Sequence, residues 1–153
     1  VLKEIIIKRP LVILGIGSEL RGDDGWANHF ISELKKKSAH GVHCIWCATT
    51  PENYLSVIAK LAPKEVLLCD AGDFKAEPGA YKLFGYTEIS DFEIMMTHRI
   101  PLNTLGSMIQ ERSGGCGVHV LLVQPETIEF SQTISLSVQK TVEILLTEFK
   151  SLL

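Results

Sequence analysis

The sequence contains no apolar run of the roughly 18 residues that a membrane-spanning helix needs. It also has no block of like charges. The 15 Lys and Arg residues nearly balance the 18 Asp and Glu residues, which gives a formal net charge of −3. These absences argue against a membrane protein and against a nucleic-acid-binding surface. Four Cys residues among 153 do not suggest a disulfide framework. The N-terminal segment is too short and too charged for a signal peptide, so we expect a cytoplasmic protein.

Two familiar nucleotide-binding loops are missing from the glycine-rich segment 15–25. Leu20 stands where a dinucleotide-binding loop has its third glycine. Asp23 and Asp24 stand where a phosphate-binding loop has Lys and then Ser or Thr. Because two carboxylates would repel a phosphate, the charge of this segment favours a cation.

The composition is that of an ordinary globular protein, with 46% hydrophobic and 22% charged residues. Its length fits one domain, which we expect to span residues 1–153. Short apolar runs typical of buried strands alternate with stretches whose apolar residues recur at helical spacing. The strands are expected at 11–16, 42–48, 66–70, 80–84 and 118–123, the helices from about 26, 51, 101 and 133, and a loop with at most a short helix at 85–99.

Strands that alternate with helices predict right-handed crossovers and a sheet that is covered on both faces. The sequence therefore predicts an α/β fold with three α/β/α layers around a mostly parallel, five-stranded sheet. In such folds, ligands bind outside the carboxyl ends of the strands. The residues that directly follow each strand are therefore the first candidates for a functional site.

Three of these strand ends and loops carry polar groups that suit a metal ion. Asp23 and Asp24 follow the first strand, Asp70 ends the third, and His98 lies in the loop before the helix at 101. Two carboxylates and an imidazole suit a borderline divalent metal and leave coordination positions open for water or substrate. Taken singly, the two adjacent acids could instead cap a helix, and His98 could be an ordinary loop histidine.

Glycines around the acid pair are expected to shape this loop. Gly17 and Gly22 allow the backbone to turn sharply, and Gly25 allows close packing at the start of the following helix. With two adjacent acids, one can fasten the loop while the other faces the cleft. We therefore count Asp23 and the glycines among the loop and substrate residues, together with Thr97, which precedes the histidine.

These motifs resemble those of the hydrogenase maturation endopeptidases, which remove the C-terminal extension from the large-subunit precursor of [NiFe] hydrogenases. The resemblance is strongest to the branch that serves formate-hydrogenlyase-type hydrogenases. The sequence departs from the family pattern at Ser18, where the family's loop usually has Asn. The matching stretches are GIGSELRGDDG at 15–25, PEN at 51–53, DAGD at 70–73 with PG at 78–79, MTHRIPLN at 96–103 and QP at 124–125.

The resemblance implies a twisted five-stranded sheet and a metal-dependent endopeptidase with nickel contacts at Asp24, Asp70 and His98. The family position in the first loop is the second acid of the pair, which selects Asp24 over its neighbour. The nickel is carried by the precursor and serves as the recognition signal, although another divalent metal could bind in vitro. We expect a monomer whose partner is this precursor, with neither nucleic acid nor membrane involved.

Two other functions fit part of the pattern. A phospho-accepting receiver domain also places an acid pair after its first strand and an acceptor Asp after its third, around Mg²⁺. Such a domain needs a lysine at the end of the last strand, where this chain has Gln124. The second alternative is a nickel-binding maturation chaperone that uses the same residues without cutting.

Overall fold

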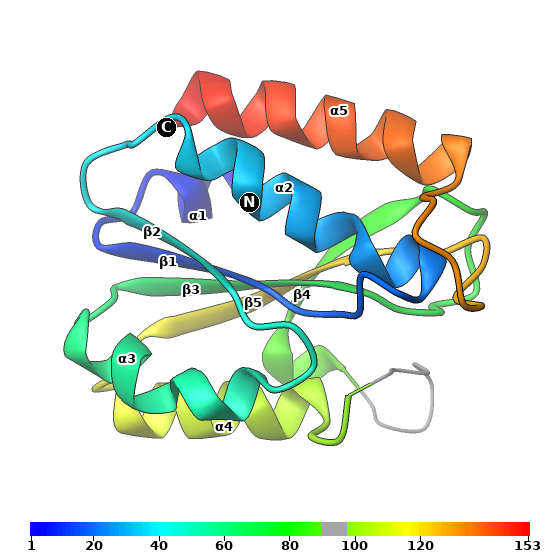
Figure 1. Cartoon of the computed structure of the whole chain (residues 1–153). Coiled ribbons are helices and arrows are strands. Elements are labelled where there is room, and N and C mark those ends of the chain that lie inside the picture. The colour runs from blue at the N-terminus through cyan, green and yellow to red at the C-terminus, as the bar shows by residue number, and fades with distance from the viewer. Residues whose placement is uncertain (90–97) are drawn as a thin grey trace.

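The computed structural model describes residues 1–89 and 98–153 and shows one twisted sheet with helices on both faces (Figure 1). Its five strands lie in the order β2-β1-β3-β5-β4. The edge strand β4 runs antiparallel to β5, and the other pairs are parallel. The predicted mostly parallel α/β/α fold is therefore confirmed. The strands are β1 (Leu11–Gly15), β2 (Val42–Trp46), β3 (Glu65–Ala71), β4 (Tyr81–Gly85) and β5 (Gly117–Val123).

Helices α1, α2 and α5 cover one face of the sheet, and α3 and α4 cover the other (Figure 1). No helix in the described ranges is both long enough and apolar enough to cross a membrane. In the part of the chain that the structure describes, the α-helices are α1 (Leu2–Ile6), α2 (Trp26–Lys35), α3 (Leu55–Lys60), α4 (Leu102–Arg112) and α5 (Leu136–Leu152). The short 3-10 helices there are η1 (Gly22–Gly25), η2 (Pro51–Tyr54) and η3 (Tyr86–Glu88).

Strand β1 shows why the apolar runs in the sequence are nearly continuous. All five of its residues are buried. The side chain of Ile13 packs in the core beneath α2 and α5, whereas those of Val12 and Leu14 pack in the core beneath α3 and α4. Because successive side chains of a strand point to opposite faces, a strand with helices on both sides needs apolar residues at every position.

Two helices differ from the sequence-based expectation. Helix α1 was not predicted, because its five residues are too few to show a helical period, although Ile5 and Ile6 are buried. Helix α5 begins at Leu136, about three residues later than expected. The backbone of Ser135 is extended, with ψ 153°, and its N–H group donates a hydrogen bond to Asp23 instead of continuing a helix upstream.

The strand order places the topological switch point of the sheet between β1 and β3. The chain leaves β1 for β2 on one side and returns to β3 on the other, so the carboxyl ends of β1 and β3 lie where the connections diverge. Ligands of open α/β sheets bind at such a switch point. The loop with Asp24 leaves β1 at this end, and Asp70 lies near the end of β3.

Candidate active site

Asp70 and His98 meet at the carboxyl end of β3, as the sequence predicted. Asp70 is the second-last residue of the buried strand β3, and it is only 1% exposed. Its Oδ1 atom accepts a hydrogen bond from the N–H group of Ala71 at 2.8 Å. Its Oδ2 atom lies 2.8 Å from Nε2 of His98, whose side chain is fully buried. A carboxylate and an imidazole 28 residues apart thus form a buried pair.

Burial and charge shift the pKa values of this pair. Burial raises the pKa of Asp70 to about 6, against the lowering effect of its hydrogen bond to His98, and the charge of Asp24 adds to the rise. Burial lowers the pKa of His98, but the hydrogen bond to Asp70 and the charge of that carboxylate outweigh it, so the pKa of His98 is raised overall. The Nδ1 atom of His98 is buried without a well-aligned hydrogen-bond partner among the described residues.

Asp24 belongs to the same region, because its charge raises the pKa of both Asp70 and His98. The side chain is 1% exposed, and its Oδ2 atom accepts a hydrogen bond from the N–H group of Ser18 at 2.7 Å. The loop closes tightly here. Gly17 has φ +140°, and a Cβ atom on it would lie 1.9 Å from the carbonyl oxygen of Asp24. Only glycine therefore fits this turn.

The three side chains do not form a ready metal cage. Within residues 1–89 and 98–153, no three His, Cys, Asp or Glu side chains are arranged so that together they could hold a metal ion. Asp70 and His98 use their facing atoms on each other. A metal would have to separate them and bring further ligands, so nickel contact by Asp24, Asp70 and His98 stays a prediction.

The neighbouring acid, Asp23, has a different task. Its fully buried carboxylate accepts hydrogen bonds from the N–H groups of Glu126, Thr127 and Ser135 at 2.7–3.2 Å, and from the hydroxyl group of Ser135 at 2.8 Å. Neither acid caps α2, whose N-cap residue is Gly25 and has no side-chain cap. Capping is therefore the wrong explanation for the pair: Asp23 fastens the glycine-rich loop to the segment before α5.

Asp23→Ala should lower the free energy of unfolding by about 3 kcal/mol, because it leaves buried donors without an acceptor. Glu111→Ala is the matched control: it removes an exposed acid from α4 and should change stability by about 0.5 kcal/mol or less. Urea denaturation of both variants measures the difference. Equal midpoints for the two variants would show that Asp23 does not hold the loop.

Of the other residues predicted to shape the loop or contact substrate, the structure describes Gly22 and Gly25. Gly22 has φ +54°, and a Cβ atom on it would lie 2.9 Å from the carbonyl oxygen of Thr127, so glycine is needed for the close approach of the two segments. Gly25 ends η1 and is buried. Thr97 and part of the predicted loop at 85–99 lie outside the described residues.

Sequence reasoning missed the segment 126–135 as a part of this region. Besides its hydrogen bonds to Asp23, the segment forms a bridge between Ser131 and Arg21. The N–H group of Gly22 donates to the carbonyl oxygen of Ser131 at 2.7 Å, and that of Ser131 donates to the carbonyl oxygen of Leu20 at 2.9 Å. The segment has no periodic pattern that could have predicted this role.

Comparison with known proteins identifies the family. The family model for HycI, a hydrogenase maturation protease, matches residues 29–150. The chain belongs to the HycI family of hydrogenase maturation proteases. It is therefore a protease, and the predicted resemblance, including the formate-hydrogenlyase-type branch, is confirmed.

The similarity to individual hydrogenase maturation proteases extends over most of the chain. It is 30% identical over 133 residues to the hydrogenase 3 maturation protease of Escherichia coli K12, covering 86% of this chain and 83% of that protein. The crystal structure of HycI from Thermococcus kodakarensis aligns with a TM-score of 0.89 at 26% identity, over 99% of this chain and 97% of the other. The solution structure of E. coli HycI aligns with a TM-score of 0.81 at 26% identity, over 92% and 89% of the two chains.

The receiver-domain alternative is wrong. Besides the family match, Gln124 occupies the place at the end of β5 where a receiver needs a lysine. Its Oε1 atom accepts hydrogen bonds from the N–H groups of Phe74 and Ala76 at 2.9 and 3.3 Å. This side chain fastens the loop after β3 and offers no positive charge to a phosphoryl group.

Proposed function

We propose that this HycI-family protease removes the C-terminal extension from the large-subunit precursor of a [NiFe] hydrogenase after nickel has been inserted. In this proposal the nickel is part of the substrate, and Asp24, Asp70 and His98 contact it. The protease acts as a cytoplasmic monomer, and other divalent cations can occupy the same donors in vitro.

The observation that carries the proposal is the contact between His98 and Asp70 at 2.8 Å, within the electrostatic reach of Asp24. Two buried carboxylates repel each other, and a divalent cation would relieve that repulsion. Carboxylate oxygens and an imidazole nitrogen are suitable ligands for nickel. A set of three protein donors leaves room for the ligands that the precursor already supplies.

The hydrogen bond between His98 and Asp70 affects how a metal can enter. An Nε2 atom that shares a proton with Asp70 has no free lone pair for a metal. An incoming nickel must therefore displace this proton or use the buried Nδ1 atom, which lacks a well-aligned partner in the described ranges. Either route makes the protein's own site a weak binder until the precursor delivers the metal. The bound nickel could then polarise the scissile carbonyl group or activate a water molecule.

A cysteine nucleophile is not favoured at this site. Cys69 precedes Asp70 in β3, but it is fully buried, and burial raises the pKa of its thiol well above the usual value. Burial also raises the pKa of Cys47, to about 12. Because the thiolate is the nucleophilic form, these cysteines are structural.

Mass analysis of a nickel-loaded precursor after incubation with the protein tests this function directly. We expect one new product that lacks the C-terminal extension, together with the released peptide. A precursor that forms a stable complex with the protein but keeps its full mass would contradict the proposal and favour the chaperone alternative.

A further inference from the structure

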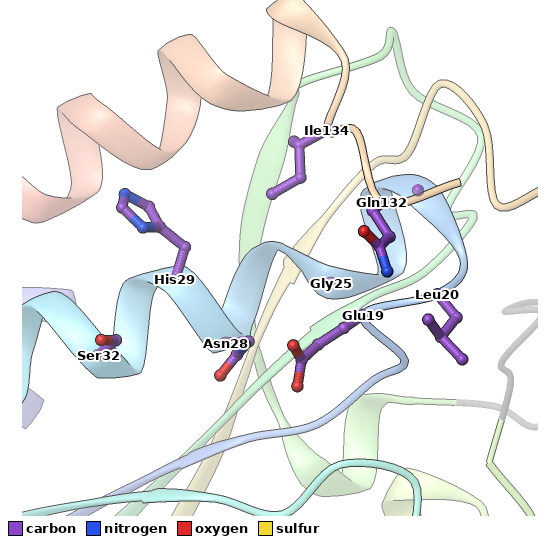
Figure 2. Close-up of a pocket in the computed structure, with 9 residues that line it drawn as sticks. Glu19, Leu20, Gly25, Asn28, His29, Ser32, Gln132 and Ile134 are labelled. Carbon is purple, nitrogen blue, oxygen red and sulfur yellow. The ribbon is translucent and has the colours of Figure 1, made fainter. Parts of the chain in front are cut away.

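A polar groove adjoins the loop that carries Asp24. It has a volume of about 470 Å³ and lies between the glycine-rich loop, the start of α2 and the segment before α5. Figure 2 shows its lining side chains arranged around the first turns of α2. Gly22 and Gly25, which flank Asp24 in the sequence, form part of its wall. The groove therefore shares the backbone of the loop that carries Asp24.

The lining of this groove suits an extended polypeptide. Asn28, Ser32 and Gln132 carry side chains that can pair with peptide N–H and C=O groups. From Gly25 to Ser32 the helix rises roughly 10 Å, enough for about three residues of extended chain. A second hollow, of about 470 Å³, shares His29, Gln132 and Ile134 with the first and continues the groove towards α5.

One exposed apolar side chain lines the groove, and a second lies on the segment that contributes Gln132 and Ile134 to it. Leu20 is 56% exposed and lines it, and Phe130, on the neighbouring segment, is 79% exposed. The guanidinium group of Arg21 lies 4.5 Å from the centre of the Phe130 ring. The Asp23 carboxylate accepts hydrogen bonds from the N–H groups of Glu126 and Ser135, and Ser131 exchanges backbone hydrogen bonds with the glycine-rich loop. The two loops that carry Leu20 and Phe130 are therefore held together. Aromatic residues and Arg, the types that stack here as Phe130 and Arg21, are enriched at protein–protein interfaces.

We propose that this groove, with Leu20 and Phe130 as its rim, holds the segment of the substrate chain next to the bond that is cut. The proposal rests on the proposed function and assigns a place to the protein part of the substrate. The polar floor would pair with the substrate backbone, and the rim would contact apolar side chains. Such a surface requires no particular sequence, only an extended segment with apolar residues.

Steady-state cleavage of the nickel-loaded precursor tests the rim. Leu20→Ala and Phe130→Ala should each raise KM about tenfold, and should affect kcat less than KM. Val57→Ala on α3 is the matched control, because Val57 is 47% exposed and lies on the opposite side of the sheet. If the wild-type protein cuts the precursor and both rim variants keep the wild-type KM, the docking surface is excluded while the proposed function stands.

A photoreactive amino acid at Ser32 tests the groove itself. We expect it to crosslink to the precursor segment that flanks the cut, whereas the same group at Ser56, an exposed serine of α3, should not. Crosslinks from Ser32 only to a second copy of the protease, or to parts of the precursor remote from the cut, would overturn the proposal. A failure of wild-type cleavage would instead reject the proposed function.

Discussion

Asp70→Asn is expected to reduce cleavage of the nickel-loaded precursor by about a hundredfold or more. The amide keeps the size of the side chain but has no negative charge to offer a cation. Its NH₂ group also cannot accept the hydrogen bond from His98. Since Asp70 is buried and its pKa is raised to about 6, loss of the charge should be tolerated by the fold. Thermal unfolding should therefore show a folded protein with little activity.

Asp73→Asn provides a control three residues further along the chain, just after β3. The side chain of Asp73 is 35% exposed and pairs with Lys75 at 3.2 Å. This variant should cut the precursor at nearly the wild-type rate. If Asp70→Asn were as active as Asp73→Asn, Asp70 would have no part in the reaction.

The same account applies to the other two predicted residues. Asp24→Ala and His98→Ala should each abolish processing and leave a folded protein. Because the proposal places all three side chains on one metal, the double variants should be hardly less active than the single ones. Undiminished processing by either single variant would remove that residue from the site.

Much of this arrangement could be predicted because strand ends follow simple rules. The apolar run before Asp70 identified a buried strand, and parallel strands bring their carboxyl ends to one edge of the sheet. That rule placed Asp70 near the loop after β1. The meeting of His98 with Asp70 followed only from the resemblance and from metal-ligand chemistry, because a loop before a helix can lie in many places.

The partners of Asp23 could not be predicted in this way. Its hydrogen-bond donors lie 103 to 112 residues further along the chain, in a segment without helical or strand periodicity. Irregular segments take their shape from tertiary contacts, so their sequences carry little local signal. The groove and its rim depend on this same segment and were missed for the same reason.

Cleavage is also expected to depend strongly on the nickel that the precursor carries. A precursor without nickel should be cut at least about a hundredfold more slowly than one with nickel, because it lacks the cation that the two carboxylates and the imidazole would bind. The chain's own site, with Asp70 and His98 paired to each other, is a poor metal cage by itself. Adding free nickel to the protease should therefore not restore cleavage of the nickel-free precursor.

The cleavage rates of nickel-loaded and nickel-free precursor, measured side by side with the wild-type protein, test the central claim most directly. The account predicts rapid release of the C-terminal peptide from the loaded form and almost none from the empty one. Equal rates for the two forms would contradict it, because Asp24, Asp70 and His98 would then have no metal to recognise.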